Sequence, residues 1–222
     1  MKEQYFTNRS IDDLSSRMLD ELGSLRAGRT LRFEPHRAAL LVLDMQRYFL
    51  DEGSHAFIPS ARPIVPRICA LMDAFLERSR PVVCTRHGNT RENAGMMGRW
   101  WRDMVPSEGP LAGIVPELGR PNMTVIGKTQ YDAFCGTDLD GMLRRENVGQ
   151  VVVTGVMTHL CCETTARSAF MLGYGVFFAV DGTATYREDF HRAALLNLSH
   201  GFAVPVLCGG IVSALAGDED GR

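Results

Sequence analysis

Apolar residues in this chain are grouped into runs separated by longer stretches of mixed character. Six runs are rich in valine, isoleucine and leucine, and they are almost continuously apolar. The runs are Ala38–Leu43, Pro81–Thr85, Thr124–Gly127, Val151–Val156, Val176–Val180 and Ala203–Leu207. A half-exposed strand alternates apolar and polar residues, so continuous runs instead predict strands that are buried on both faces.

The stretches between the runs predict helices, because their apolar residues recur at helical spacing and share one face. Such faces are formed by Ile64, Ile68, Leu71 and Phe75 after Pro63, by Leu139, Met142 and Leu143 after Thr137 as N-cap, by Cys162, Ala166, Ala169 and Phe170 before Gly173, and by Phe190, Ala193, Ala194 and Leu198 before Gly201. The alternation predicts a three-layer α/β/α fold with a doubly wound sheet of about six mostly parallel strands, since helices supply the crossovers that parallel strands need. Ligands of such sheets bind at the carboxyl ends of the strands.

The first segment outside this alternation is residues 1–35, which predict an N-terminal arm with one amphipathic helix. Ser10 and Asp13 match a capping box, and Gly23 ends the pattern. The apolar stripe between them consists of Ile11, Leu14, Met18 and Leu22. We expect the arm to pack on the main domain, residues 36–215, or on a neighbouring subunit.

The second such segment is residues 88–118, which are long for a connection and include Trp100 and Trp101. Loops of this length are often functional covers, so the segment predicts a lid over a site. The alternative is that both tryptophans are buried as a satellite of the core.

Composition and charge narrow the classes of partner. With 222 residues and 45% apolar content, the chain suits one large domain. A net charge of −2, with both signs mixed, offers no footprint for nucleic acid or an anionic membrane. No apolar stretch is long enough to span a bilayer, and the N-terminus lacks the apolar region of a secretion signal. We therefore expect a cytoplasmic protein whose partner is a small-molecule substrate. We also expect a homo-oligomer, a dimer or tetramer.

The six cysteines form no regular framework and no C-x-x-C pair, which argues against disulfides and a zinc cage. Cys69, Cys84 and Cys208 lie within apolar runs and predict buried, reduced thiols.

Unusual polar residues stand at three of the predicted strand ends. Asp44 closes one run, Lys128 closes another, and Cys161 begins the helix after a third. Each alone has a structural explanation, but all three are expected at the same edge of the sheet. A thiol becomes a good nucleophile when a helix N-terminus, a cation and a nearby base favour its thiolate. The set therefore predicts nucleophilic catalysis, with a cysteine–histidine pair using His87 or His159 as the less favoured arrangement.

Three sequence blocks, LVLDMQRYFL, GKTQYDAFCGTDLD and GVMTHLCCETTARSAF, resemble the signature blocks of isochorismatase-like cysteine hydrolases. The resemblance extends over residues 33–212. It implies an isochorismatase-like, Rossmann-type fold and a catalytic triad of Asp44, Lys128 and Cys161. Cys162 falls on a position that is usually apolar in that family, which makes it the less suitable nucleophile.

The resemblance also implies a mechanism of acyl transfer without a cofactor. Asp44 would deprotonate Cys161, the thiolate would attack a small amide or related carbonyl, and the resulting thioester would be hydrolysed by water. The backbone amides of Met157 and Cys161 would form the oxyanion hole. The family typically has a non-proline cis peptide in the third block, here between Val156 and Met157.

One motif of the related nicotinamidases is incomplete. They carry a D-x-H metal motif after the second strand, where this chain has Thr85 and His87 with Arg86 between them. We therefore expect no metal, and nicotinamide is not the favoured substrate. Arg86 could instead pair with a substrate carboxylate, since its planar guanidinium suits one. The candidate substrate-binding residues are Gln46, Phe49, Arg86, Trp100, Tyr131 and His159.

Two alternative functions remain open. A true isochorismatase, which hydrolyses a vinyl ether and releases pyruvate, is supported by the block around Asp44 and by His159, but that subgroup usually lacks the nucleophilic cysteine. The other alternative is a non-catalytic binding or scaffold protein that has kept the fold. The intact set of Asp44, Lys128 and Cys161 argues against it.

Overall fold

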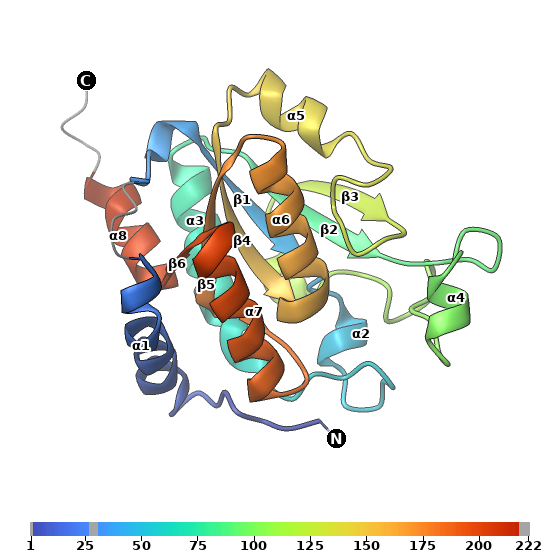
Figure 1. Ribbon diagram of the computed structural model, residues 1–222. Coiled ribbons are helices and arrows are strands. Elements are labelled where there is room, and N and C mark those ends of the chain that lie inside the picture. Colours follow the sequence, from blue (N-terminus) through green and yellow to red (C-terminus); the bar gives the residue numbers. More distant parts are fainter. Residues whose placement is uncertain (1, 27–30, 218–222) are drawn as a thin grey trace.

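A computed structural model describes residues 2–26 and 31–217 of the chain (Figure 1). Its strands form one parallel sheet in the order β3-β2-β1-β4-β5-β6, which confirms the predicted α/β fold. The strands are β1 (Ala38–Leu43), β2 (Val82–His87), β3 (Thr124–Lys128), β4 (Gln150–Val156), β5 (Gly175–Ala184) and β6 (Val204–Val206). Every predicted apolar run thus contains a strand.

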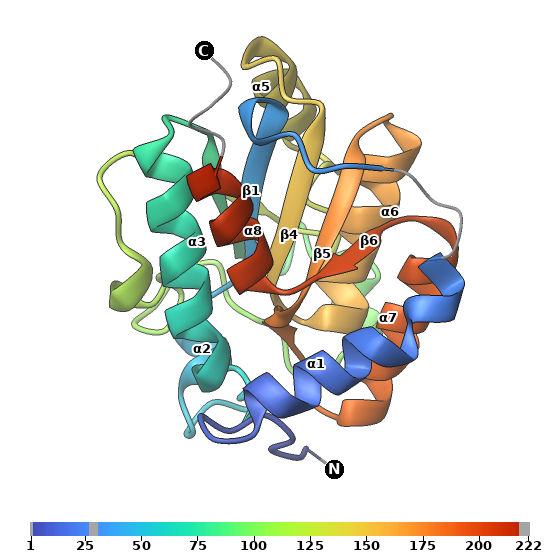
Figure 2. The same cartoon turned by 90° about the vertical axis from the view of Figure 1, so that its left-hand side faces the viewer.

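Helices cover both faces of this sheet. They are α1 (Ile11–Glu21), α2 (Arg47–Leu50), α3 (Val65–Glu77), α4 (Met97–Trp100), α5 (Leu139–Arg145), α6 (Glu163–Met171), α7 (Glu188–Gly201) and α8 (Cys208–Gly217). Figure 2 shows α1, α3 and α8 on one face, with α6 and α7 on the other. β1 and β4, in the middle of the sheet, are buried along their whole length, whereas most of the edge strand β3 is exposed.

The N-terminal arm packs on the body of its own chain. Phe6 and Ile11 are fully buried, and the predicted stripe of α1 faces the core. The capping box does not form, because the Ser10 hydroxyl donates to the Tyr5 carbonyl (3.3 Å) and accepts from the Thr7 amide (3.0 Å). The sequence pattern located this helix correctly but not the hydrogen bonds at its start.

Three details of the predicted helices differ from the structure. Asp138, not Thr137, is the N-cap of α5, and the Thr137 hydroxyl accepts from the amide of Leu139 at 3.2 Å. Phe170 of α6 and Phe190 of α7 are 49% and 42% exposed, on the outer sides of their helices. The inner face of α7 is instead formed by His191, Ala194, Leu195 and Leu198. The buried face of α7 therefore includes His191, a polar residue, and differs from the face that apolar residues alone predict.

The strand order reverses between β1 and β4, and a close backbone approach marks this point. A β-bulge shifts the register of β4 and β5 at Gly155, whose φ is +107°. A Cβ atom at Gly155 would lie 2.0 Å from the carbonyl oxygen of Leu43. Only glycine fits here, so this residue lets β4 pass against the end of β1, where Asp44 follows.

Residues 88–118 run over the carboxyl edge of the sheet and contain the short helix α4 (Figure 1). Trp100 is 75% exposed, so it is not part of a satellite core, while Trp101 is only partly exposed. Cys69 is half-buried, whereas Cys84 and Cys208 are buried as expected. None of the helices in the described parts of the chain is long and apolar enough to cross a membrane.

Candidate active site

Asp44 lies immediately after β1 in a left-handed backbone conformation, with φ at +53°. Its side chain is completely buried. Thr85 of β2 holds it twice, because the threonine hydroxyl donates to Asp44 Oδ1 at 2.6 Å and accepts from the Asp44 amide at 3.1 Å. The carboxylate therefore has a fixed direction at the carboxyl end of the sheet.

Lys128, the last residue of β3, brings a cation to this carboxylate. Its Nζ lies 2.7 Å from Asp44 Oδ2 and 3.4 Å from the sulfur of Cys161, and it donates to the carbonyl of Gln130 at 2.9 Å. The ammonium is buried at the centre of the group. A buried charge is tolerated when it is paired and hydrogen-bonded in this way.

Cys161 lies in a π-helical turn, Thr158–Cys162, that follows β4 and leads into α6. The peptide bond between Val156 and Met157, just before this turn, is cis, as the sequence comparison with the family implied. Cys161 is 5% exposed, and it lines a pocket. The structure thus brings Asp44, Lys128 and Cys161 together.

Burial favours the protonated form of the Cys161 thiol. Burial raises the pKa of Cys161 to about 12, and the attraction of Lys128, which lowers it, does not compensate. Burial alone would lower the pKa of Lys128, but Asp44 and Cys161 raise it, so the lysine stays charged. Lys128, a cation that favours a thiolate, is therefore present, but burial raises the pKa of the thiol more than Lys128 lowers it. Forming the nucleophile requires that the proton move to a base within the group.

A raised pKa gives a testable pH dependence. We expect the alkylation of Cys161 by iodoacetamide to accelerate about tenfold per pH unit from neutral pH upward, because the thiolate is a minority species below a pKa of about 12. Peptide-resolved mass spectrometry measures this rate, with the exposed Cys135 of the same sample as reference. A rate for Cys161 that levels off near pH 7 would contradict the assignment of a resting thiol.

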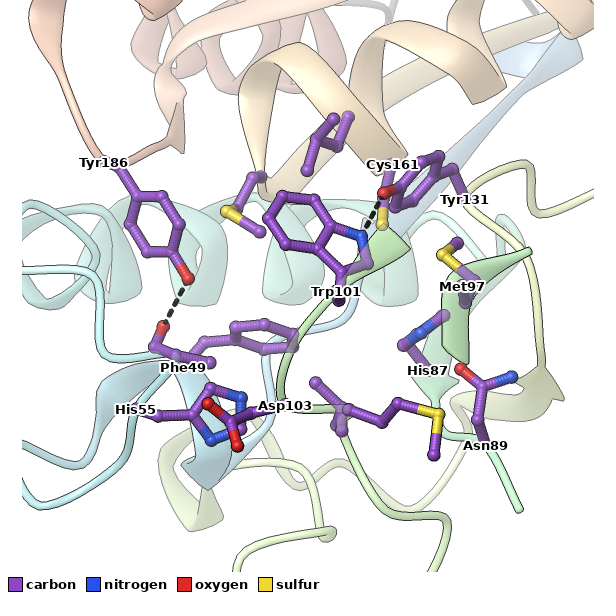
Figure 3. Close-up of a pocket in the computed structure, with 15 residues that line it drawn as sticks. Phe49, His55, His87, Asn89, Met97, Trp101, Asp103, Tyr131, Cys161 and Tyr186 are labelled. Carbon is purple, nitrogen blue, oxygen red and sulfur yellow. Dashed lines mark hydrogen bonds between the residues drawn. The ribbon is translucent and has the colours of Figure 1, made fainter. Parts of the chain in front are cut away.

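The pocket above Cys161 is small and mostly apolar, with a volume of about 80 Å³ (Figure 3). Its walls are aromatic (Phe49, Trp101, Tyr131, Tyr186), thioether (Met97, Met104, Met157), polar (His55, His87, Asn89, Asp103) and small or aliphatic (Ala56, Val105, Leu160). Trp101 donates its indole N–H to the Tyr131 hydroxyl at 2.6 Å, which joins residues 88–118 to the loop after β3. Among the described residues that form the walls there is no lysine or arginine.

Of the predicted substrate contacts, Phe49 and Tyr131 line this pocket. Trp100 does not, and its neighbour Trp101 takes that place. Arg86 is exposed and lines a separate hollow beside Arg47. A strand residue points to the face opposite its neighbours, so the position after Thr85 cannot turn inward with Thr85 and His87 on either side.

Gln46 and His159 also lie outside the pocket and have structural partners. The Gln46 amide donates to the carbonyls of His87 (3.0 Å) and Ala112 (2.9 Å), which ties the long loop to β2. His159 Nδ1 lies 2.7 Å from the Thr185 hydroxyl, and its ring stacks on Phe190. Both residues support the site and do not face it.

Several wall residues were not foreseen from the sequence, notably His55, Asn89, Met97, Asp103 and Tyr186. They come from irregular loops, where no hydrophobic periodicity predicts which side chain turns inward. Trp101 carried the only usable signal, since a pair of aromatic residues in a long loop is unusual.

Sequence comparison shows which known families and proteins this chain resembles. The family model described as Isochorismatase domain matches residues 38–208. "Nicotinamidase 3" of Arabidopsis thaliana is 37% identical over 88% of this chain and 98% of its own length. The "Isochorismatase" of Bacillus subtilis is 32% identical over 73% of this chain, which spans 53% of that protein.

Solved structures agree in fold. A cysteine hydrolase from Pseudomonas syringae superposes with a TM-score of 0.80 at 24% identity, covering 84% of this chain and 96% of that one. A pyrazinamidase of Pyrococcus horikoshii, solved in complex with zinc, superposes with a TM-score of 0.70 at 26% identity, covering 77% of this chain and 99% of that one.

The residues of this chain do not fit a metal at the corresponding edge. Within residues 2–26 and 31–217 no group of three histidine, cysteine, aspartate or glutamate side chains could hold an ion. Thr85 stands where the D-x-H motif has its aspartate, and its hydroxyl is already bonded to Asp44. We therefore derive the chemistry of this site from the protein's own side chains.

Proposed function

This chain belongs to the isochorismatase family of hydrolases, and from that premise we propose that it is a cysteine-dependent hydrolase of a small amide or related C–N bond. The observation that carries the proposal is the contact of Lys128 with both Asp44 and Cys161 at the base of an aromatic pocket. A nucleophile, a base and a cation within contact distance are the groups that covalent acyl transfer needs.

In the first step, Asp44 takes the proton of Cys161 as the substrate enters, and Lys128 stabilises the thiolate. The sulfur attacks the carbonyl carbon, and the carbonyl oxygen becomes an oxyanion bound by the backbone amides of Met157 and Cys161. Entry of the substrate fills the pocket and excludes water, which strengthens the electrostatic contacts of the ion pair. A resting thiol is compatible with this order of events, because the proton moves only when a carbonyl is present to be attacked.

In the second step, the C–N bond breaks and Asp44 gives its proton to the leaving nitrogen. The product amine departs and leaves a thioester on Cys161. Asp44, again a carboxylate, then activates a water that attacks the thioester carbon, and the acid product leaves while the thiol is restored. Lys128 remains charged throughout and balances the carboxylate.

The pocket favours a flat and uncharged substrate. Aromatic side chains on several sides suit a planar ring, whereas the described wall residues provide no cation for a carboxylate and include Asp103. A primary amide on an aromatic ring meets these conditions. Nicotinamide is such a molecule. The incomplete D-x-H motif did not favour it, but the name of the Arabidopsis relative makes it the first substrate to test.

The same lining argues against isochorismate. That substrate carries two carboxylates, and burying an anion without a partner is unfavourable. Arg86, the expected partner for a carboxylate, is on the outside. Hydrolysis of a vinyl ether also has no use for a thiol nucleophile.

Substrate charge provides the test of this proposal. We expect neutral aromatic amides, nicotinamide and benzamide, to be hydrolysed with a kcat/KM at least about tenfold higher than that of 3-carboxybenzamide, because the last buries an unpaired charge. Ammonia release measures all three on one scale, and pyruvate release from isochorismate is followed in parallel. Hydrolysis of isochorismate alone, with no amide cleaved, would refute the proposed function.

A further inference from the structure

The N-terminal arm is connected through His191 of α7 to the turn that carries Cys161. Tyr5 is buried, and its hydroxyl has partners just after β5 and in α7. The backbone amide of Thr185 donates to this hydroxyl at 3.0 Å, and His191 Nδ1 lies 3.2 Å from it. Tyr5 and His191 are thus joined by a hydrogen bond whose donor is set by the tautomer of the ring.

His191 connects Tyr5 to the turn. Its Nδ1 also lies 2.9 Å from the hydroxyl of Thr158, the first residue of the turn, and both side chains are fully buried. Burial lowers the pKa of His191 to about 3, and the nearby Arg192 adds to this effect. The ring is therefore neutral, and its single Nδ1 is shared between the Tyr5 and Thr158 hydroxyls, with the donor and acceptor roles set by the tautomer.

The next residue of the turn is held by the same group. His159 Nδ1 lies 2.7 Å from the hydroxyl of Thr185, whose amide is bonded to Tyr5. Two consecutive residues, Thr158 and His159, are thus bonded to His191 and Thr185, which both bond to the Tyr5 hydroxyl. The amides of Leu160 and Cys162 on either side of the nucleophile both donate to the Met157 carbonyl, so movement of Thr158 is transmitted to Cys161.

The arm is itself firmly anchored. The amides of Tyr5 and Phe6 donate to the Ser60 hydroxyl at 2.9 and 3.1 Å, and Phe6 packs edge-on against the His191 ring. A buried tyrosine hydroxyl needs a partner wherever it lies. Here its partners lead to the residue three positions before the nucleophile.

We propose that Tyr5, His191 and Thr158 are positioning residues, through which the N-terminal arm sets the place of the Cys161 sulfur relative to Lys128 and Asp44. This inference rests on the proposed function for the role of Cys161, but its geometry does not depend on which substrate is cleaved. Reactivity falls steeply when a nucleophile is displaced by a fraction of an ångström to one ångström.

The test compares the reactivity of the thiol in matched tyrosine variants. We expect Tyr5→Phe, which removes only the hydroxyl, to reduce the iodoacetamide alkylation rate of Cys161 by roughly three- to tenfold, since one net hydrogen bond is lost. The kcat for amide hydrolysis should fall by a similar factor while KM changes less than about twofold. Tyr174→Phe is the control, because this tyrosine is equally buried and donates to Asp140 at 2.7 Å, away from the site. It should lower Tm without changing the alkylation rate.

Variants at Thr158 test the same Tyr5–His191–Thr158 connection at the end nearer to Cys161. Thr158→Ser keeps the hydroxyl and should retain the wild-type alkylation rate, whereas Thr158→Val should match Tyr5→Phe. The double variant should be no slower than the slower single variant, because both changes break one path.

Three outcomes would overturn the inference: unchanged alkylation and kcat in Tyr5→Phe, equal loss in Tyr174→Phe, or failure of Thr158→Ser to restore the rate. The proposed function fails by a different result, namely amide hydrolysis that persists without Cys161. The two failures are therefore distinguishable on the same set of proteins.

Discussion

Replacing Cys161 with alanine is expected to reduce amide hydrolysis by roughly 10³- to 10⁶-fold, because the groups that remain cannot substitute for the covalent step. Asp44 and Lys128 would still be paired, but no atom would attack the carbonyl. The rate of ammonia release, with one amide substrate present at a time, measures the loss of activity. Mass spectrometry of the wild-type enzyme during turnover should show an acyl adduct on the peptide that contains Cys161.

Cys162→Ala is the matched control, since Cys162 is also buried in the same turn and its sulfur is bonded weakly to the Thr154 carbonyl. It should keep most of the activity and lose about 1 kcal/mol of stability through the small cavity. An adduct on Cys162 would reverse the assignment of the nucleophile. A Cys161→Ala protein that releases pyruvate from isochorismate at the wild-type rate would favour the vinyl-ether reaction.

The second large effect is expected for Asp44→Asn. The amide keeps the shape of the side chain and a partner for Thr85, but it cannot accept the thiol proton, so kcat should fall by roughly 10³-fold or more. The change also leaves Lys128 buried without its counter-ion. Desolvation, which lowers the pKa of Lys128, would then be opposed only by weaker contacts. Breaking a buried pair from one side typically costs about 3–5 kcal/mol in the free energy of unfolding.

The variant Asp181→Asn distinguishes the loss of a catalytic base from the loss of stability. Asp181 is also a buried, ion-paired aspartate, bonded to Arg67 at 3.2 Å and to the amide of Cys208 at 2.8 Å, and it is outside the pocket. Urea denaturation should show that both variants are destabilised, while only Asp44→Asn loses kcat. Equal loss of kcat in both variants would mean that Asp44 acts through the fold and not as a base.

The strands and the meeting of Asp44, Lys128 and Cys161 could be predicted from the sequence for one physical reason. Doubly buried parallel strands need continuous apolar runs, and a polar residue that ends such a run must emerge at the carboxyl edge of the sheet. The positions of Asp44 and Lys128 then follow from topology, and that of Cys161 follows from the helical turn after β4. The cis peptide before Met157 was foreseen only through the resemblance to the family.

The walls of the pocket could not be predicted in this way. Trp101 rather than Trp100 turns inward, and Tyr186 and Asp103 come from loops whose conformations depend on tertiary contacts. The role of Tyr5 was also hidden, since an aromatic residue before an amphipathic helix looks like ordinary packing. Apolar spacing also gave the wrong buried face where a polar residue is buried: in α7, His191 is buried and Phe190 is exposed.

The wall composition has a practical consequence for chemical labelling. A pocket whose described walls lack lysine and arginine should discriminate among electrophiles by charge as well as by shape. Neutral reagents such as aromatic aldehydes and nitriles, which form reversible adducts with thiols, are therefore better starting points for inhibitors than carboxylated ones. For the same reason iodoacetamide, rather than iodoacetate, is the suitable reagent for counting functional sites in a preparation.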